Sequence, residues 1–496
     1  MNVGLYASVS GLLTAQRAID VASHNIANAE TEGFSRQRGD VSTAVSLSIA
    51  SVGNLGTGVK LDGIRRVRDE LLDRQFRQEQ ATLGEMEVRA ESLGKLEDLL
   101  GEPGEGSLSQ QFNVYFESWQ RLTTNPENTS FRLALRESAL KLTQTFNQLS
   151  EDVENMRSDL NDRANSMVTD INTKASQVAE LNRQIVATLV QGQSPNDLQD
   201  QRDLLIDQLT KLVKVQVVPI ASSGAINVYL GNQRLVAGAS HYPLDQTTID
   251  PTKDTATIFF AGTKLAAPVE GGSLKALLEL RNETLARITP DTGKPAGLLN
   301  RLDELANKLI TDTNVLHQGG FGLEGSTGKD FFTGTRGAAD ITLNTDLLDS
   351  FDGVKFNYGY LAIGAAAQPP GDAGSGSSNN DMAQQISARR FAKVLTVVDP
   401  PPGAPPEAVP KATQSFEEYW QATVMTISVT TQSVTRTMKT QESLIGSVKE
   451  RREAISAVST DEEMANVIRY QKAYAASARM LTTIDEMLDT LLSIGR

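Results

Sequence analysis

The chain contains no cysteine, which excludes disulfides, thiolate metal ligands and cysteine nucleophiles. Histidine is nearly absent too: His24, His241 and His317 lie far apart, without the i, i+4 spacing of a helical metal site. We therefore expect no metal, no cofactor and no catalytic residue. His24 stands between Ser23 and Asn25, and its expected role is local capping or packing near the end of a helix.

Long apolar runs are also missing. No stretch of about 20 apolar residues is present, so we expect no membrane span. The first thirty residues lack the basic segment and apolar block of a cleavable secretory signal, which predicts another route if the protein leaves the cell. With 47 basic and 61 acidic residues the net charge is −14, and this argues against nucleic acid as a partner.

The 496 residues exceed one ordinary core and indicate about three domains. The pattern is helical at both ends and β-rich in the middle, which predicts a multidomain α+β fold. Predicted helices cover 4–28, 64–100, 107–123, 130–190, 197–213, 273–288, 297–317 and 416–493. Extended segments cover 36–63 and four short runs between 214 and 262, and SPND (194–197) is expected to provide a helix N-cap.

A chain that leaves a helical body and returns to it forms discontinuous domains. Residues 1–63 and 455–496 are predicted to form a terminal coiled-coil layer, and 64–213, 272–325 and 412–454 a mainly helical second domain. Two outer parts are inserted in the middle. One is β-rich (214–271), and the other is β-rich or irregular (326–411) with a proline linker, DPPPGAPPEAVP.

Both terminal helices carry a seven-residue apolar repeat, which is typical of a coiled-coil seam. A globular amphipathic helix is the simpler alternative. The N-terminal positions are Leu5, Val9, Leu12, Ile19 and Ile26; the C-terminal positions are Val467, Tyr470, Tyr474, Leu481, Ile484, Leu488 and Leu491. We expect each seam to pair with the other or with a neighbouring subunit, and the ends to be loose in the monomer and ordered on assembly.

The other polar features of the sequence are interpreted as structural, not as binding or catalytic sites. Asn25 and Asn28 are expected to cap the first helix, with a bridge to a neighbouring subunit as the second choice. The acidic clusters DELLD (69–73) and DEE (461–463) are interpreted as solvated helix faces. GSTGKD (325–330) and GNLGTG (53–58) lack the spacing or context of phosphate loops and are interpreted as turns.

Three blocks in these terminal regions carry a family resemblance. LYASVSGLLTAQRAIDVASHNIANAETEGFSRQ (5–37), GTGVKLDGIRRVRDELLDRQFR (56–77) and DEEMANVIRYQKAYAASARMLTTIDEMLDTLLSIG (461–495) resemble the conserved ends of flagellar rod, hook and hook-associated proteins. Within that group, SRQ after the glycine, PNDLQDQRDLLIDQL (195–209) and GGSLKALLELRN (271–282) are similar to the FlgK family at the hook–filament junction. AVSTDEE (457–463) departs from the usual family lead.

The resemblance implies an extracellular structural subunit of the bacterial flagellum, exported by the flagellar type III apparatus. It implies a ring of about eleven copies at the distal end of the hook. Hook protein would lie below, a second junction protein leading to flagellin above, and an export chaperone would bind the C-terminal helix. Alternatives are another axial component such as hook protein, or a secreted hydrolase or adhesin that uses helical ends for export.

Overall fold

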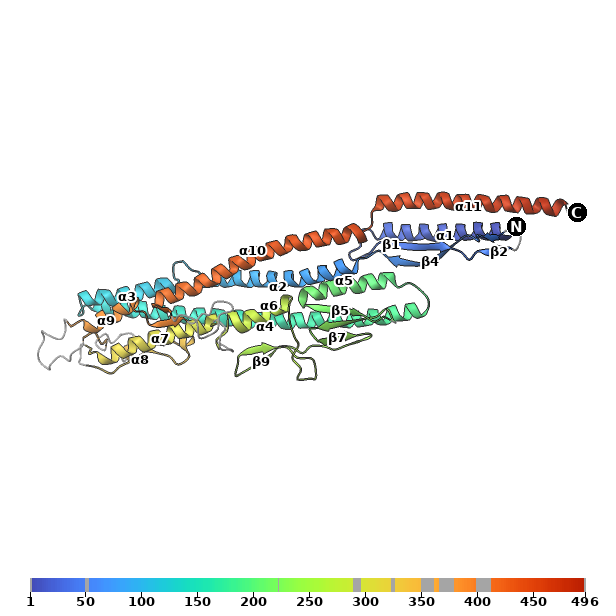
Figure 1. Ribbon diagram of the computed structural model, residues 1–496. Helices are drawn as coiled ribbons and strands as arrows, with labels where there is room; N and C mark the ends of the chain where they lie inside the picture. Colours follow the sequence, from blue (N-terminus) through green and yellow to red (C-terminus); the bar gives the residue numbers. More distant parts are fainter. Residues whose placement is uncertain are drawn as a thin grey trace, which may run out of the picture.

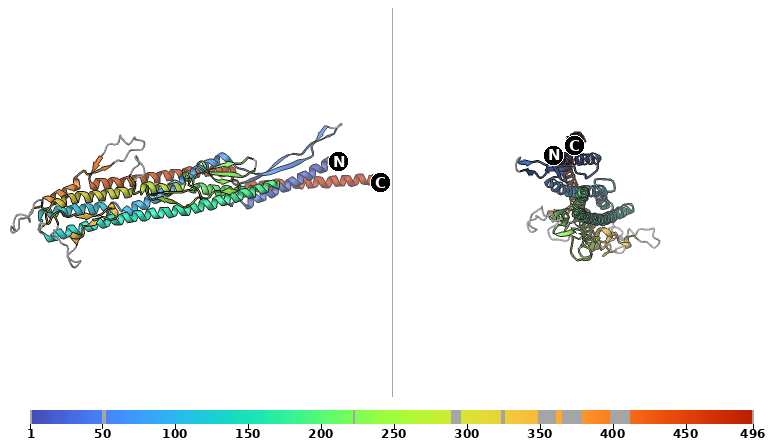
Figure 2. Two further views of the ribbon diagram at one scale, coloured as in Figure 1. Left: turned by 90° about the horizontal axis from the view of Figure 1, so that it is seen from below. Right: turned by 90° about the vertical axis from the view of Figure 1, so that its right-hand side faces the viewer.

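The computed structural model describes residues 2–49, 53–221, 223–288, 296–322, 326–348, 361–364, 379–397 and 412–494. The molecule is an elongated rod, and both chain ends lie at one tip of it (Figure 1). The two further views agree, with the terminal helices extending beyond the thicker helical body (Figure 2). The predicted multidomain α+β fold with helical ends is confirmed.

The end of the rod is built from the first and last segments of the chain. Helix α1 (Asn2–Ala27) lies beside α11 (Thr460–Ile494), and β1 (Gln37–Thr43) pairs antiparallel with β4 (Val59–Arg66). A short hairpin of β2 (Leu47–Ile49) and β3 (Gly53–Leu55) extends this ribbon. Below, these elements are called the end layer. The extended segment predicted over 36–63 is confirmed.

The helix expected from residue 64 begins later than predicted. Residues 64–66 belong to β4, and α2 (Glu70–Leu100) starts after the N-cap Asp69, whose side chain accepts hydrogen bonds from the amides of Leu71 and Leu72. The apolar residues of the strand and of the helix follow each other closely, so the sequence pattern did not show this boundary. Helix α2 ends where predicted, at Gly101 in the left-handed conformation.

The helical body packs five long helices around one apolar core. They are α2, α3 (Leu108–Thr124), α4 (Thr129–Val190), α7 (Leu298–Gly319) and α10 (Phe416–Ser456). Trp119 and Trp420 are fully buried, and Phe112 packs its ring against Phe146 and Phe416 from distant parts of the chain. The 62 residues of α4 confirm the predicted long helix, which lies along α3, α5 and α6 rather than standing alone.

Helix α5 (Asn196–Leu212) connects the body to the end layer, but its predicted cap is wrong. Pro195 occupies the N-cap position and makes no side-chain cap. The Asn196 side chain instead donates to Gln37 Oε1 and to the Ile64 carbonyl, at 3.1 and 3.0 Å. The Asn196 side chain therefore binds two segments of the end layer and does not cap α5.

The middle of the chain contributes strands that pack on the same body. The four-stranded antiparallel sheet contains β5 (Val215–Pro219), β6 (Ile226–Leu230), β7 (Gln233–Ala237) and β8 (Ser240–His241). Its buried side chains, including Val228 and Leu235, belong to the same apolar cluster as those of α4. The paired strands β9 (Thr248–Asp250) and β10 (Thr255–Thr257) follow. Helix α6 (Ser273–Glu279) continues as a π-helical turn, Leu280–Thr284, so the helix predicted to residue 288 is shorter.

The segment from 326 onward contains more helix than expected. It holds the strand pair β11 (Phe332–Thr333) and β12 (Thr342–Leu343), short α8 (Thr345–Leu348), and α9 (Asp381–Ala388), which packs on α3. The pair β13 (Leu395–Val397) and β14 (Ala412–Gln414) leads into α10. The proline linker lies outside the described residues.

Candidate assembly site

Small residues of α1 line the contact between the two terminal helices. A side chain on Gly4 would meet Ile484 at 3.6 Å, and one on Gly11 would meet Ser477 Oγ at 3.0 Å. The same seven-residue spacing runs through Ser8, Ala15 and Ala22, which are all buried. Because these side chains are small, the two helix backbones approach closely.

The C-terminal seam follows the predicted repeat. Ile484 is buried, and Val467, Tyr470, Leu481 and Leu488 are half-buried. Tyr474 is exposed over 38% of its surface. The side chain of Leu491 lies outside the described residues.

The predicted N-terminal seam is displaced by about one residue from the buried line. Leu5, Leu12, Ile19 and Ile26 are half-buried, and Val9 is exposed. The pattern identified the large apolar residues, whereas α11 packs tightly against the neighbouring glycines and alanines. Whether these larger side chains contact a neighbouring subunit stays a prediction.

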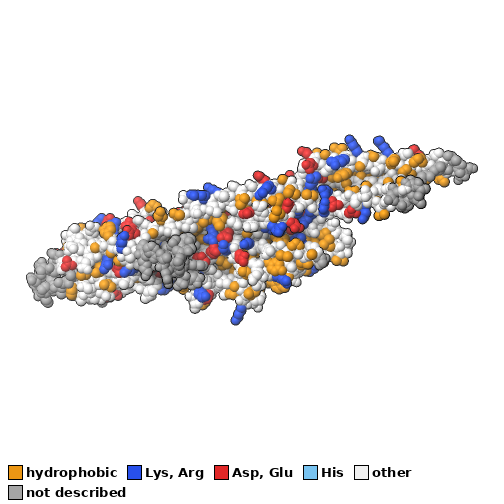
Figure 3. Space-filling model, viewed as in Figure 1, with side chains coloured by type: hydrophobic (Ala, Val, Ile, Leu, Met, Phe, Trp, Pro, Cys, Tyr) orange, Lys and Arg blue, Asp and Glu red, His pale blue; other side chains and the backbone are white. Residues whose placement is uncertain are grey.

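Both terminal helices leave apolar side chains at the surface of the end layer. Tyr6 is 66% exposed on α1, and Met480 and Leu492 are 59% and 71% exposed on α11. Hydrophobic side chains are visible along this end of the space-filling view (Figure 3). The other exposed members of the set are Val9, Leu13, Met464, Ile468, Tyr474 and Met487. Below, this set is called the exposed apolar face.

The two asparagines of the N-terminal motif have different roles. Asn28 caps its own helix as predicted, because its Nδ2 donates to the His24 carbonyl at 3.0 Å. Asn25 is fully buried and binds strand β1: its Nδ2 donates to the Gln37 carbonyl, and its Oδ1 accepts from the Gln37 amide, both at 2.9 Å. The capping prediction is therefore wrong for Asn25. His24 packs edge-on against Phe34, as expected.

The SRQ motif holds the end layer to the helical body. The Ser35 amide and hydroxyl donate to the two carboxylate oxygens of Asp200 on α5, at 3.0 and 2.7 Å. Gln37 Nε2 donates to Asp197 on the same helix, at 2.7 Å. Arg36 bridges to α11 instead, with its Nε at 2.8 Å from Glu463 Oε1.

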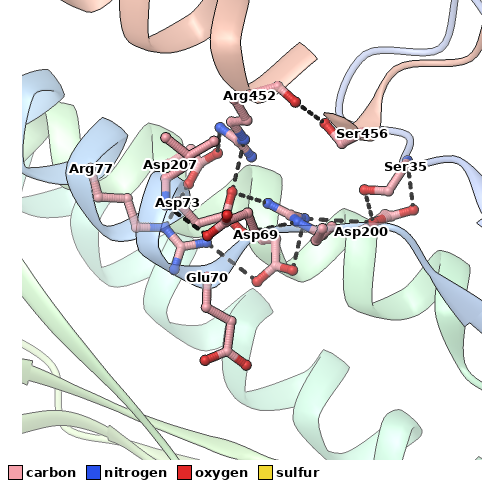
Figure 4. Close-up of polar contacts among 12 residues, drawn as sticks. Ser35, Asp69, Glu70, Asp73, Arg77, Asp200, Asp207, Arg452 and Ser456 are labelled. Carbon is pink, nitrogen blue, oxygen red and sulfur yellow. Dashed lines mark hydrogen bonds and ion pairs between the residues drawn. The ribbon is translucent and has the colours of Figure 1, made fainter. Parts of the chain in front are cut away.

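A buried ionic network continues this contact into α2 and α10 (Figure 4). Arg66 Nη1 lies 2.8 Å from Asp200 and 2.7 Å from Asp203, and Arg68 joins Asp203 to Asp73. Arg77 binds Asp207 at 2.7 Å. Arg452, near the end of α10, lies 2.8 Å from both Asp73 and Asp207. These residues and the SRQ contacts are called the ionic joint.

Charge pairing shifts the pKa values within the ionic joint. Burial alone raises the pKa of Asp203, but the charges of Arg68, Arg66 and Arg77 outweigh it and lower that pKa to about 2. Burial likewise opposes the charged form of Arg68, while Asp203 and Asp73 raise its pKa above the ordinary range. Asp203 and Arg68 therefore both carry their charges at neutral pH.

The solvated-face interpretation of two acidic clusters is wrong for one residue in each, while Asp69, Glu70, Asp461 and Glu462 are exposed as predicted. Asp73 of DELLD is buried between Arg68 and Arg452, and Glu463 of DEE is buried against Arg36. Arg68 lies five residues before Asp73, but Arg452 and the Arg36 partner of Glu463 are far away in sequence, so only the basic residues in RRVRDELLD and SRQ could have indicated the pairing.

The buried histidine of the body, His317, has a packing role. His317 is fully buried; burial lowers its pKa to about 4, against a hydrogen bond to the Lys329 carbonyl, and its Nε2 accepts from the Ala362 amide. No group of His, Asp or Glu among the described residues has the arrangement of a metal site. Within the same residues, none of the helices has the length and apolar character needed to cross a membrane.

Comparison with known proteins identifies the family of this chain. Flagellar hook-associated protein 1 of Bacillus subtilis is 30% identical over 99% of this chain and 98% of its own length. The chain belongs to the flagellar hook-associated protein 1 family. Its Salmonella typhimurium and Escherichia coli members are 27% and 25% identical, each over 98% of this chain. The protein is thus a structural component of the flagellar hook–filament junction.

Family descriptions match separate parts of this hook-associated protein. Residues 93–332 match the flagellar hook-associated protein FlgK helical domain, 5–34 the flagella basal body rod protein, and 453–494 the C-terminal part of the flagellar basal body rod FlgEFG protein. The solved structure of the flagellar hook junction protein FlgK from Burkholderia pseudomallei shares the fold. Its TM-score is 0.59 at 17% identity, and the match covers 77% of this chain and all of that one.

Proposed function

We propose that this hook-associated protein forms a ring of about eleven subunits at the distal end of the hook. Hook protein would lie below the ring, and the second junction protein, leading to flagellin, above it. The observation that carries the proposal is the exposed apolar face on both terminal helices. Such a face is stabilised by contact with neighbouring subunits, because its burial removes apolar surface from water.

The assembly interface follows from this placement. We assign to it the larger apolar residues of both repeats together with the exposed apolar face, while the glycine and alanine line pairs α1 with α11 inside each subunit. The proposed contacts with neighbouring subunits are Leu5, Val9, Leu12, Ile19, Ile26, Val467, Tyr470, Tyr474, Leu481, Leu488 and Leu491. Ile484, the remaining position of the C-terminal repeat, packs on Gly4 inside the subunit and supports the same layer. Asn25 and Asn28 support these contacts from within the subunit.

The mechanism of the junction is geometric. Residues 1–63 and 455–496 act as the innermost layer that stacks on the hook, and 64–213, 272–325 and 412–454 as the second domain. Residues 214–271 and 326–411 face outward. The ionic joint holds the end layer at a fixed orientation to the body. A stiff subunit of this kind can join a flexible hook to a rigid filament without a catalytic step.

Export is part of the same proposal. The chain would leave the cell unfolded through the flagellar type III apparatus, and an export chaperone would cover α11 beforehand. Exposed Met464, Met480 and Met487 suit such a partner, because methionine adapts its shape to different apolar surfaces.

Cysteine cross-linking tests the proposed interface, because the chain has no cysteine of its own. Val9→Cys with Ile468→Cys should give covalent oligomers in isolated flagella treated with a short bismaleimide. Val190→Cys with Val315→Cys, two exposed positions on the body, is the matched control and should stay monomeric. Monomers alone from the first pair, in flagella that contain the protein, would contradict the interface.

A further inference from the structure

The buried charges at the ionic joint do not balance. Apart from the SRQ contacts, five arginines and four aspartates lie in the joint or directly beside it, and each is at most about one-fifth exposed. They are Arg66, Arg68, Arg77, Arg202 and Arg452 with Asp73, Asp200, Asp203 and Asp207. Buried charges are costly unless each one is paired, so one excess guanidinium calls for an anion.

Arg202 on α5 is the unmatched cation. It is 95% buried, and its Nη1 donates to two neutral groups, Asn182 Oδ1 at 3.1 Å and the Gly224 carbonyl at 3.0 Å. Its Nε is buried and has no hydrogen-bond partner. Among the residues that the structure describes, no carboxylate lies within the 4.0 Å of an ion pair to Arg202. The other four arginines each have at least one.

The environment of Arg202 is electropositive. Burial lowers the pKa of Arg202 to about 10; Asp203 opposes this, while the charges of Arg66, Arg77 and Arg68 add to it. An anion placed beside this guanidinium would offset both the burial and the repulsion from the three neighbouring arginines.

Arg202 also lines a cavity of about 890 Å³ between β4, the start of α2, α5 and β5. Three further cations line the cavity: Arg65 of β4, which pairs with Asp40 at 2.7 Å, Arg74 of α2, and Lys214 just before β5. Carboxylates line it as well, namely Glu70, Asp73, Asp203 and Glu270. Asp73 and Asp203 are already paired with Arg68, and Glu270 lies 3.9 Å from Lys214.

We propose that this cavity binds one oxyanion, a phosphate or a carboxylate, on the part of the Arg202 guanidinium that Asn182 and Gly224 leave open. Planar guanidinium groups bind these oxyanions through paired N–H donors. The anion balances the fifth arginine and strengthens the contact between β4, α2 and α5. The source is either free phosphate or an acidic side chain of a neighbouring copy. The inference does not depend on the proposed function.

Titration of the purified full-length chain with inorganic phosphate tests the site, with sodium chloride at matched ionic strength as the reference. Isothermal titration should show saturable one-to-one binding, and the midpoint of thermal unfolding should rise. Arg202→Gln should weaken phosphate binding at least tenfold. Arg163→Gln, which removes an exposed arginine paired with Glu91, should leave the binding unchanged.

A rim variant covers the case in which Arg202→Gln does not fold. Arg74→Gln changes an exposed residue that lines the cavity and should weaken phosphate binding several-fold without loss of structure. Binding that does not saturate, or that both cavity variants keep at full strength, would overturn the proposal.

Incorporation then separates the two sources of the anion. Arg202→Gln is expressed in cells that lack the native protein, and its incorporation at the hook is measured by immunoblotting of isolated flagella. Normal incorporation of a folded variant assigns the site to free phosphate. Loss of incorporation, with wild-type monomer still binding phosphate, assigns it to a carboxylate of a neighbouring subunit.

Discussion

Asn25 and Asn28 stand three residues apart in one motif, yet only Asn28 serves its own helix. The side-chain amide of Asn25 binds both the backbone amide and the backbone carbonyl of Gln37 in strand β1, as the backbone of a neighbouring strand would. The sequence identified both as polar residues at a helix end. It could not identify the partner of Asn25, because that partner depends on how the chain folds back after Gly33.

Asn25→Ala should destabilise the end layer by about 2 kcal/mol or more, because it leaves two buried backbone groups without partners. Asn28→Ala should cost about 1 kcal/mol or less, since its site is partly exposed to water. Amide exchange at Gln37 measures the difference. Equal protection of Gln37 in both variants would contradict the role given to Asn25.

Asp203 makes the stability of the ionic joint dependent on pH. Its pKa is about 2 when folded, against an ordinary 3.8. A lowered folded-state pKa stabilises the folded form above the unfolded-state value, and this contribution is lost as the pH falls from about 4 through 2. From these pKa values, Asp203 contributes about 2 kcal/mol at neutral pH.

Urea unfolding of the wild type and of Asp203→Asn measures this contribution. The free energy of unfolding should favour the wild type by about 2 kcal/mol or more at pH 7, and the difference should shrink toward pH 2. Asp170→Asn, on the exposed side of α4, is the control and should show little difference at either pH. A wild-type advantage that is constant from pH 7 to 2 would argue against the paired carboxylate.

At the scale of elements, helix periodicity was the most reliable signal. The positions of α3 and α4 were predictable because each long helix buries a continuous stripe. The helical stretch predicted over 416–493 was also found, but it divides into α10 and α11 between Ser456 and Thr460, a break that the pattern did not locate. The start of α2, the cap of α5 and helix α9 were not predictable. In those places, contacts from remote segments outweigh the local pattern, as Asn196 shows with Gln37 and Ile64.

Leu481 tests the role of α11 as an assembly helix. Leu481→Asp should leave the monomer soluble and its helical body folded, but abolish incorporation, since an unpaired charge in an apolar contact costs several kcal/mol. Gln471→Asp adds the same charge at an exposed polar position and should still assemble. Circular dichroism and swimming in soft agar are the readouts. Motile cells that carry Leu481→Asp would count against the interface.

At the scale of the whole molecule, the terminal helices and the helical body differ in how much apolar surface they bury. The body shares one apolar core from α2 to α10, whereas among the α11 positions of the predicted repeat whose side chains the structure describes, Ile484 alone is buried in the single chain. The ionic joint connects these unequal parts. Several residues of the joint were singled out in the sequence, in SRQ and PNDLQDQRDLLIDQL. The sequence did not show that these two segments contact each other.

Hydrogen exchange of the free monomer should therefore separate the two parts. Residues 4–24 and 464–488 should exchange faster than the buried centre of α4, over 135–179, because the end layer is a single thin layer. In assembled flagella the ends should become protected. Full protection of residues 4–24 in the free monomer would contradict ordering on assembly.

Electron microscopy of a strain that lacks the gene for this protein tests the placement at the junction most directly. The cells should carry hooks of normal appearance without filaments, and flagellin should accumulate in the medium. Restoration by the full-length gene is the control. Filaments that remain attached to the hooks, or cells without hooks, would contradict a junction subunit between hook and filament.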